Sequence, residues 1–256
     1  MLSSQLRIGR HLRIEDSHSS AEIYSRARFT HPGLSLVIRE HLLRLGLLGG
    51  TFDPIHLGHL ELAKTALRVA RLDAIHFVTS VHPPHKSEKT QANFLDRHAM
   101  VALALKGDSR LIPSSLEFDR EGKSYSIDTV LQLKQLSGGN AEIFFLIGLD
   151  AFIELPTWKE YRRFSELCSF IVFGRPGYPE NLMQDLPKAF RPKPIGSGEQ
   201  TTVLTEADGG AFLLRDFINP LSSTEIRSAI QAGRSIREYV PPDVEEYILK
   251  TKLYLN

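Results

Sequence analysis

Apolar residues follow two alternating patterns from Leu45 onward. Short apolar runs bounded by glycine, proline or polar residues are typical of buried strands. Between these runs, apolar residues recur at every third or fourth position, which is the spacing of one helix face. The runs that predict strands cover residues 45–48, 74–78, 111–118, 143–147, 171–173 and 212–214, and the helical spacing covers 60–70, 95–103, 127–137, 222–232 and 241–253.

This alternation predicts an α/β fold with a doubly wound, Rossmann-like parallel sheet and helices on both faces. The run at 143–147 is almost continuously apolar, as expected for a strand buried on both sides. Residues 174–198 are rich in proline and glycine and are expected to form an irregular connection. In such a fold, ligands bind beyond the carboxyl ends of the strands where the strand order reverses. We therefore expect the chemistry in the loops after the first, second and fourth strands.

The composition narrows the class of protein. A chain of 256 residues with 42% apolar and 24% charged residues can bury a full core. The net charge of +1 provides no general attraction to nucleic acids or membranes, and we expect neither as a partner. The longest apolar run, 143–149, is far too short to span a membrane. The single Cys168, expected to be a small buried hydrophobe, excludes a disulfide framework within the chain and a multi-cysteine zinc site, so we expect a cytoplasmic protein.

Residues 1–43 differ from the rest of the chain. From Met1 to Arg44 there are seven arginines and no lysine, with four acidic residues and no persistent apolar period. The segment lacks the apolar stretch of a secretory signal, and its acidic residues argue against an organelle transit peptide. We expect a disordered N-terminal extension over 1–43, followed by one domain over 44–256. The alternative is a start site assigned too far upstream, with the true start at Leu34, Leu36 or Val37.

The segment Gly49–His59 carries the most specific chemical signal, because it directly follows the first predicted strand. Its glycines allow the backbone to approach a ligand closely, and the helix that begins near His56 presents free N–H groups that favour an anion. His56 and His59 are three residues apart, so both project from one face of the first helical turn. Imidazoles beside a phosphate gain proton affinity and donate to its oxygens. The alternatives for these histidines are helix capping and metal binding.

A second signal lies at Ser222–Arg227, before the predicted helix at 222–232. Ser222 or Ser223 can cap that helix through a side-chain oxygen. Simple capping is a sufficient explanation of this segment taken alone.

Together these segments resemble the nucleotidyltransferase superfamily that carries a His-x-Gly-His motif. Within it the chain closely resembles the bacterial nicotinate-mononucleotide adenylyltransferases, over about residues 45–254. Two features depart from the family pattern, namely the N-terminal extension and Ser126, where threonine is more usual. The resemblance rests, beyond the first motif, on Pro83-Pro84-His85-Lys86, Arg97-His98-Ala99-Met100, Ser124-Tyr125-Ser126-Ile127-Asp128-Thr129, Ile147-Gly148-Leu149-Asp150, Trp158, Arg175-Pro176-Gly177 and Ser222-Ser223-Thr224-Glu225-Ile226-Arg227.

The resemblance implies roles for individual residues. It implies that Trp158 stacks on a nicotinate ring, although a lone tryptophan is usually a core residue, and that Lys86 reaches a phosphate, although it could be a solvated surface lysine. It implies that Asp150 binds ribose hydroxyls, although an aspartate there could simply cap a helix. The implied catalytic residues are His56, His59, Lys86 and Arg227; the implied ATP-binding residues are Gly50, Thr51, Phe52, His56, His59, Gly148, Asp150, Ser222, Ser223, Thr224 and Arg227; and the implied mononucleotide-binding residues are Lys86, Tyr125, Ser126 and Trp158.

The reaction implied by the resemblance joins ATP and nicotinate mononucleotide into nicotinate adenine dinucleotide and releases pyrophosphate. It implies Mg²⁺ carried with ATP and no metal ion held by the protein alone, and it leaves open whether the chain forms a homo-oligomer. Pantetheine-phosphate adenylyltransferases and cytidylyltransferases share the first motif and are the nearest alternatives. A fragment of a class I aminoacyl-tRNA synthetase is disfavoured by the modest length and the lack of a basic face. A noncatalytic nucleotide-binding protein is expected to lack one of His56, His59 or Arg227, and all three are present.

Overall fold

The computed structural model describes most of the chain after residue 41. The described residues are 42–81, 90–118, 120, 122–174, 193–195, 210–218 and 221–255. The expectation of a disordered extension and that of a later start site fall almost entirely on residues outside these ranges. So do the assignment of Lys86 and the resemblance at Arg175-Pro176-Gly177. Strand β1 (Leu43–Gly50) begins the described fold, one residue before the predicted domain boundary.

The fold is built on a seven-stranded sheet with the order β3-β2-β1-β4-β5-β7-β6, and every neighbouring pair of strands is parallel. From β1 the chain proceeds outward through β2 and β3, then returns to place β4 on the other side of β1. The strand order therefore reverses between β1 and β4, as in a doubly wound sheet. Besides β1, the strands are β2 (Ala74–Thr79), β3 (Leu111–Ser114), β4 (Ala141–Gly148), β5 (Ser169–Gly174), β6 (Lys193–Ile195) and β7 (Ala211–Ile218).

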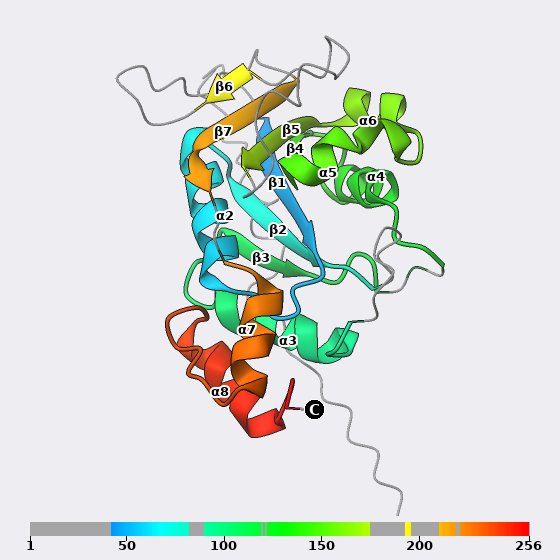
Figure 1. Cartoon of the computed structure of the whole chain (residues 1–256). Helices are drawn as coiled ribbons and strands as arrows, with labels where there is room; N and C mark the ends of the chain where they lie inside the picture. Colours follow the sequence, from blue (N-terminus) through cyan, green and yellow to red (C-terminus); the bar gives the residue numbers. More distant parts are fainter. Residues whose placement is uncertain are drawn as a thin grey trace, which may run out of the picture. The chain divides into compact units, whose positions relative to one another are not determined.

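Helices cover both faces of this sheet, which confirms the predicted fold class (Figure 1). One apolar cluster joins α2, α3, α7 and α8 to side chains that point to one face, such as Phe144 and Leu146 of β4. The intervening Phe145 points to the other face and contacts Phe164 of α6. The helical elements are α2 (Leu57–Val69), α3 (Phe94–Leu105), α4 (Ser126–Leu136), α5 (Leu149–Ile153), the 3-10 turn η1 (Leu155–Thr157), α6 (Tyr161–Leu167), α7 (Ser223–Gln231) and α8 (Pro242–Thr251). No helix within the described ranges has the length and apolar character to cross a membrane.

Three parts of the predicted layout are wrong. The third strand ends at Ser114 rather than residue 118, because the chain turns there and the Phe118 N–H donates to the Ser115 carbonyl at 2.8 Å. The connection expected to be irregular over 174–198 contains β6, a three-residue strand at the sheet edge, where its proline is tolerated. Helices α5 and α6 were not predicted, because their five and seven residues are too few to show a helical period.

His76 on β2 is a buried titratable residue whose environment can be tested through the pH dependence of folding. Its side chain is buried, and its Nε2 atom has no hydrogen-bond partner among the residues that the structure describes. Burial lowers the pKa of His76 from 6.5 to about 4 because the charged imidazolium is poorly solvated there. Between these two pH values the unfolded chain binds more protons than the folded one, so folding stability is lost as the pH falls.

We predict that His76→Leu reduces the pH dependence of folding. Between about pH 7.5 and about pH 4.5, the wild-type free energy of unfolding should fall by about 2 to 3 kcal/mol more than that of the variant. Urea unfolding of both proteins at the two pH values measures this difference. Parallel pH dependences would show that His76 is not buried in its neutral form.

Candidate active site

The loop after β1 lies where the strand order reverses, at the carboxyl end of a central strand. Strand β1 ends at Gly50, and α2 begins at Leu57 with His56 as its N-terminal cap residue, as predicted. Phe52 has a left-handed backbone with φ of 49°, which turns the chain sharply after the strand. The expected free N–H groups at the start of α2 are partly wrong, because the Leu57 N–H donates to the Tyr239 carbonyl at 2.8 Å and the His59 N–H donates to the His56 carbonyl at 2.9 Å.

The two histidines of this loop stack on each other. Their ring centroids are 3.7 Å apart and their planes are inclined by 30°, which confirms that both project from one face of the first turn. His56 is buried, whereas His59 is partly exposed and receives the Phe52 ring edge-on at a centroid distance of 5.1 Å. The His56 N–H donates to Nδ1 of His59 at 3.2 Å, so the pair also caps the helix. Nδ1 of His59 is therefore the acceptor of this bond and is not a donor to a ligand.

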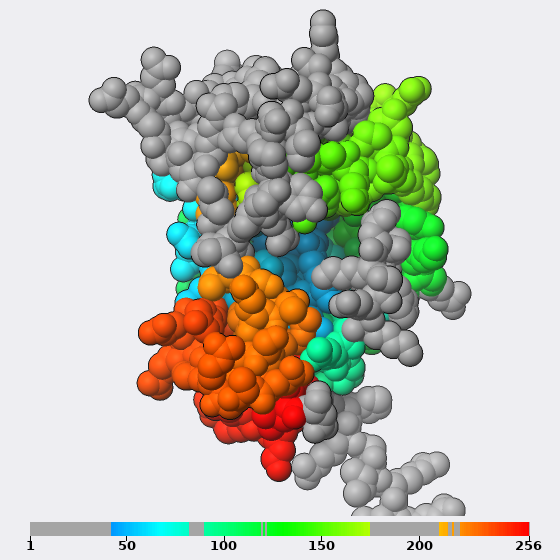
Figure 2. Space-filling model, viewed as in Figure 1, coloured from blue at the N-terminus to red at the C-terminus, as the bar shows by residue number. Residues whose placement is uncertain are grey.

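Helix α7 brings the second motif onto the same loop. Ser222 is its cap residue and accepts a hydrogen bond from the Thr224 N–H at 3.2 Å, so the capping interpretation is confirmed. Ser223 instead donates its hydroxyl to the Pro54 carbonyl at 2.9 Å. Arg227 donates to the Asp53 carbonyl at 2.7 Å and to Thr224 Oγ1 at 3.2 Å. In Figure 2 the orange atoms of the α7 region lie next to the blue atoms of the β1 region.

The structure adds a buried polar cluster beneath the loop that the sequence analysis did not identify. It consists of Asp53, Arg97 and Tyr254, each of them buried. The Tyr254 hydroxyl donates to the Asp53 carboxylate at 2.8 Å, and Arg97 donates to the Thr51 carbonyl at 2.6 Å. In the sequence, Arg97 was noted only as part of a segment that resembles the family, and nothing pointed to Tyr254.

Other predicted residues lie at the ends of neighbouring elements. Gly148 ends β4 and caps α5, and Asp150 lies in the first turn of α5. Tyr125 is the cap residue of α4, and Ser126 is the first residue of that helix. These positions place the residues at helix N-termini near the carboxyl edge of the sheet, where backbone N–H groups favour anionic groups.

Trp158 packs against the core, as one of its two interpretations predicts, while its stacking on a nicotinate ring stays a prediction. Its ring is parallel to that of Phe164, with centroids 6.1 Å apart, and edge-on to Phe145 at 6.3 Å. The residue is only partly buried, so the indole is held by the core while part of its surface remains accessible. Cys168 is buried as expected, and burial raises the pKa of its thiol.

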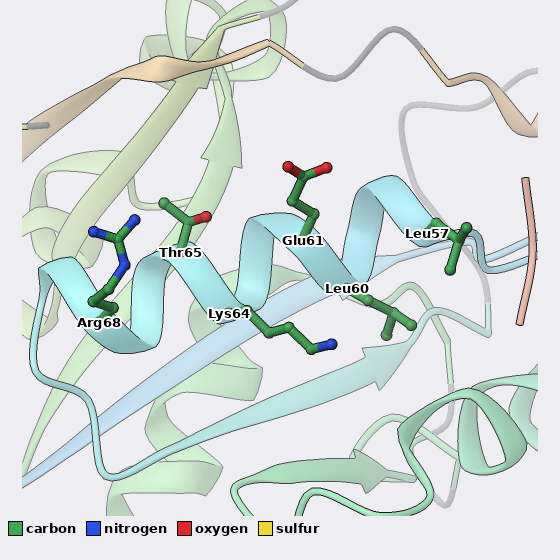
Figure 3. Close-up of a pocket in the computed structure, with 6 residues that line it drawn as sticks. All are labelled: Leu57, Leu60, Glu61, Lys64, Thr65 and Arg68. Carbon is green, nitrogen blue, oxygen red and sulfur yellow. The ribbon is translucent and has the colours of Figure 1, made fainter. Parts of the chain in front are cut away.

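A hollow of 330 Å³ lies elsewhere, along the outer side of α2 (Figure 3). None of the predicted site residues lines it, and its lining mixes acidic and basic side chains of one helix. The lining residues are Leu57, Leu60, Glu61, Lys64, Thr65 and Arg68. Across the described ranges, no group of three or more His, Cys, Asp and Glu side chains is arranged to hold a metal ion.

Comparison with known proteins gives consistent matches. The cytidylyltransferase-like family matches residues 47–229. A nicotinate-nucleotide adenylyltransferase from Syntrophotalea carbinolica is 39% identical over 215 residues, covering 83% of this chain and 97% of the relative. One from Thermus thermophilus is 39% identical over 212 residues, covering 83% of this chain and 100% of the relative. The solved structure of Plasmodium falciparum nicotinic acid mononucleotide adenylyltransferase complexed with NaAD has a TM-score of 0.61 at 20% identity, covers 83% of this chain and 97% of that chain, and shows the same fold.

We predict that Gly50→Ala destabilises the loop and Gly49→Ala does not. A Cβ atom at Gly50 would lie 2.8 Å from the Phe52 ring, which contacts His59, whereas one at Gly49 would have no atom within 4 Å. Moving the buried Phe52 ring should lower the free energy of unfolding by about 1 to 3 kcal/mol. Urea unfolding of both variants measures the effect, and equal stabilities would contradict the close contact at Gly50.

Proposed function

The chain belongs to the nicotinate-nucleotide adenylyltransferases of the cytidylyltransferase-like family, and from this membership we propose that it transfers the adenylyl group of ATP to nicotinate mononucleotide. The chain spans 97% and 100% of the two relatives, so the whole catalytic domain of those proteins has a counterpart here. The observation that carries the proposal is the stacked pair His56 and His59 on the loop after β1, to which the second motif is hydrogen-bonded.

The reaction forms one bond and breaks one. An oxygen of the mononucleotide phosphate attacks the α-phosphorus of ATP, and the bond from this phosphorus to the bridging oxygen of the β-phosphate breaks. Pyrophosphate leaves with the electron pair. The attacking phosphate has a second pKa near ~6 and is largely dianionic at neutral pH, so the protein needs no general base. Its task is to bring two anions together and to stabilise the charge on the phosphate oxygens.

The first loop suits this task. The His59 ring is proposed to donate to a phosphate oxygen through Nε2, and His56 holds His59 in place through its backbone N–H. Gly50, Thr51 and Phe52 form the turn that would let the triphosphate approach the backbone. Donors held in place before the reaction stabilise developing charge without reorganisation.

The second motif supplies further donors. Arg227 has five N–H donors, of which two bond to Asp53 and Thr224, while Nε has no partner among the described residues. Its charge lies beside the first loop, and because Nε is buried, the remaining N–H groups of its two terminal nitrogens are the ones proposed to bind ATP phosphates. Ser222, Ser223 and Thr224 at the start of α7 would contact the same phosphates.

The ends of β4 and α4 would bind the remaining parts of the two substrates. Gly148 and the Asp150 carboxylate are proposed to bind ribose hydroxyls of ATP. The Tyr125 and Ser126 N–H groups at the start of α4 are proposed to bind the nicotinate carboxylate, with Trp158 stacking on the ring. Lys86, outside the described residues, is proposed to neutralise phosphate charge at the reaction centre, and Mg²⁺ would enter as part of the ATP substrate.

The proposal extends to the organisation of the chain. We place the enzyme domain at residues 44–256 and treat residues 1–43 as a separate extension. We assign the reaction to the cytoplasm, because the free thiol of Cys168 suits a reducing compartment.

We predict that nicotinate mononucleotide is the preferred acceptor. The N–H donors proposed to bind the nicotinate carboxylate would lack a partner when nicotinamide mononucleotide is bound. The kcat/KM for nicotinate mononucleotide should therefore exceed that for nicotinamide mononucleotide by about 10²-fold or more. Pyrophosphate release with ATP and each acceptor measures the ratio, with 4′-phosphopantetheine as a third acceptor. Equal use of the acid and the amide, or a preference for phosphopantetheine, would contradict the proposal.

We also predict that His59→Ala lowers kcat about 10²- to 10³-fold, the usual cost of removing one preorganised donor from a charged transition state. The free energy of unfolding of the variant is measured alongside to show that the protein remains folded. A folded variant with nearly normal turnover would remove His59 from the mechanism.

A further inference from the structure

The Asp53 carboxylate is a junction between three segments of the chain. Its Oδ2 accepts a hydrogen bond from the Gln91 N–H at 2.9 Å, and its Oδ1 accepts from the Ala92 N–H at 3.2 Å. Oδ1 also accepts from the Tyr254 hydroxyl at 2.8 Å. The residue is 5% exposed, so these three donors replace most of the water that an ionised carboxylate requires.

Arg97 makes the complementary set of contacts. Its guanidinium donates to the Thr51 carbonyl at 2.6 Å and to the Ser80 carbonyl at 2.8 Å, and its Nε donates to the Ala92 carbonyl at 3.2 Å. Burial lowers the pKa of Arg97, and the negative charge of Asp53 opposes this effect. The two residues therefore form a buried, charge-compensated pair that connects the loop after β1 to the end of β2 and to the start of α3.

Tyr254 reaches this pair because the chain reverses after α8. The Leu253 N–H donates to the Ile248 carbonyl at 3.2 Å, and Lys252 and Tyr254 both have left-handed backbones, with φ of 56° and 65°. The Tyr254 ring is buried as a result. Burial and the charge of Asp53 raise the pKa of Tyr254, so its hydroxyl remains a hydrogen-bond donor at neutral pH.

We propose that Tyr254 is a positioning residue for adenylyl transfer, acting through Asp53 on the loop Gly49–His59. Asp53 follows Phe52, whose ring contacts His59, and its carbonyl accepts the hydrogen bond from Arg227. A displacement of Asp53 therefore shifts both phosphate-binding motifs at once. The inference rests on the proposed function. It states that Tyr254, which lies outside every recognised motif, keeps the donors of the two phosphate-binding motifs aligned with the α-phosphate of ATP.

A matched control is available in the same part of the molecule. Tyr247 of α8 donates its hydroxyl to Asp96 of α3, and this bond also measures 2.8 Å. Tyr247→Phe thus removes a tyrosine–aspartate hydrogen bond near the C-terminal end without touching the loop. Tyr254→Phe removes the equivalent bond to the loop and keeps the buried ring.

The test compares kcat and KM of wild type, Tyr254→Phe and Tyr247→Phe. The kcat of each protein is calculated per ATP-binding site, and isothermal titration calorimetry measures the number of these sites. Tyr254→Phe should lower kcat by about 10- to 100-fold, the loss that accompanies ångström-scale misplacement of reacting groups, while leaving both KM values nearly unchanged. Tyr247→Phe should keep wild-type kcat. An unchanged kcat in Tyr254→Phe, or equal losses in the two variants, would overturn the positioning role.

A double-mutant cycle with Asp53→Ala tests the route of the effect, because alanine removes the acceptor of the Tyr254 hydrogen bond. If Tyr254 acts through Asp53, the double variant should have the kcat of Asp53→Ala alone, whereas independent multiplication of the two losses would overturn the inference. If Tyr254→Phe does not fold, Arg97→Lys takes its place, because lysine keeps the charge but loses the multiple carbonyl contacts. The same fall in kcat at constant KM is then expected, and its absence overturns the inference. A wild type that releases no pyrophosphate would overturn the proposed function itself, and the role in catalysis with it.

Discussion

The arrangement of the loop after β1 depends on one buried negative charge. An ionised carboxylate inside a protein is strongly destabilising unless donors and a compensating charge surround it. Asp53 meets this requirement with two backbone N–H groups, the Tyr254 hydroxyl and the nearby Arg97. These partners come from separate parts of the chain, so satisfying this single carboxylate requires that they assemble around the loop in one arrangement.

The parallel sheet gives this assembly its location. The strand order reverses between β1 and β4, and doubly wound sheets bind their ligands at the carboxyl edge next to such a reversal. Helix N-termini and α7 are directed to this edge, and Ser223 and Arg227 join α7 to the first loop. The groups proposed to bind phosphate therefore belong to rigid elements, and their positions follow from packing rather than from contact with a ligand.

Local patterns were sufficient to predict the parallel sheet, the start of α2 and the common face of His56 and His59. Each of these depends on neighbouring residues, through apolar runs, helix periodicity or a three-residue spacing. The bond between Asp53 and Tyr254 joins residues 201 positions apart, and nothing near Tyr254 indicates its partner. Helices α5 and α6 and strand β6 were missed because each is too short for its periodicity to be visible.

The distance along the chain between Asp53 and Tyr254 also affects how the protein matures during translation. A ribosome synthesises β1 and its loop about 200 residues before the tyrosine that completes the buried cluster. Until that tyrosine leaves the exit tunnel, the Asp53 carboxylate lacks one of its donors, and the nascent loop is incompletely supported. The loop proposed to bind phosphate thus reaches its final form only after a residue translated about 200 positions later has joined it.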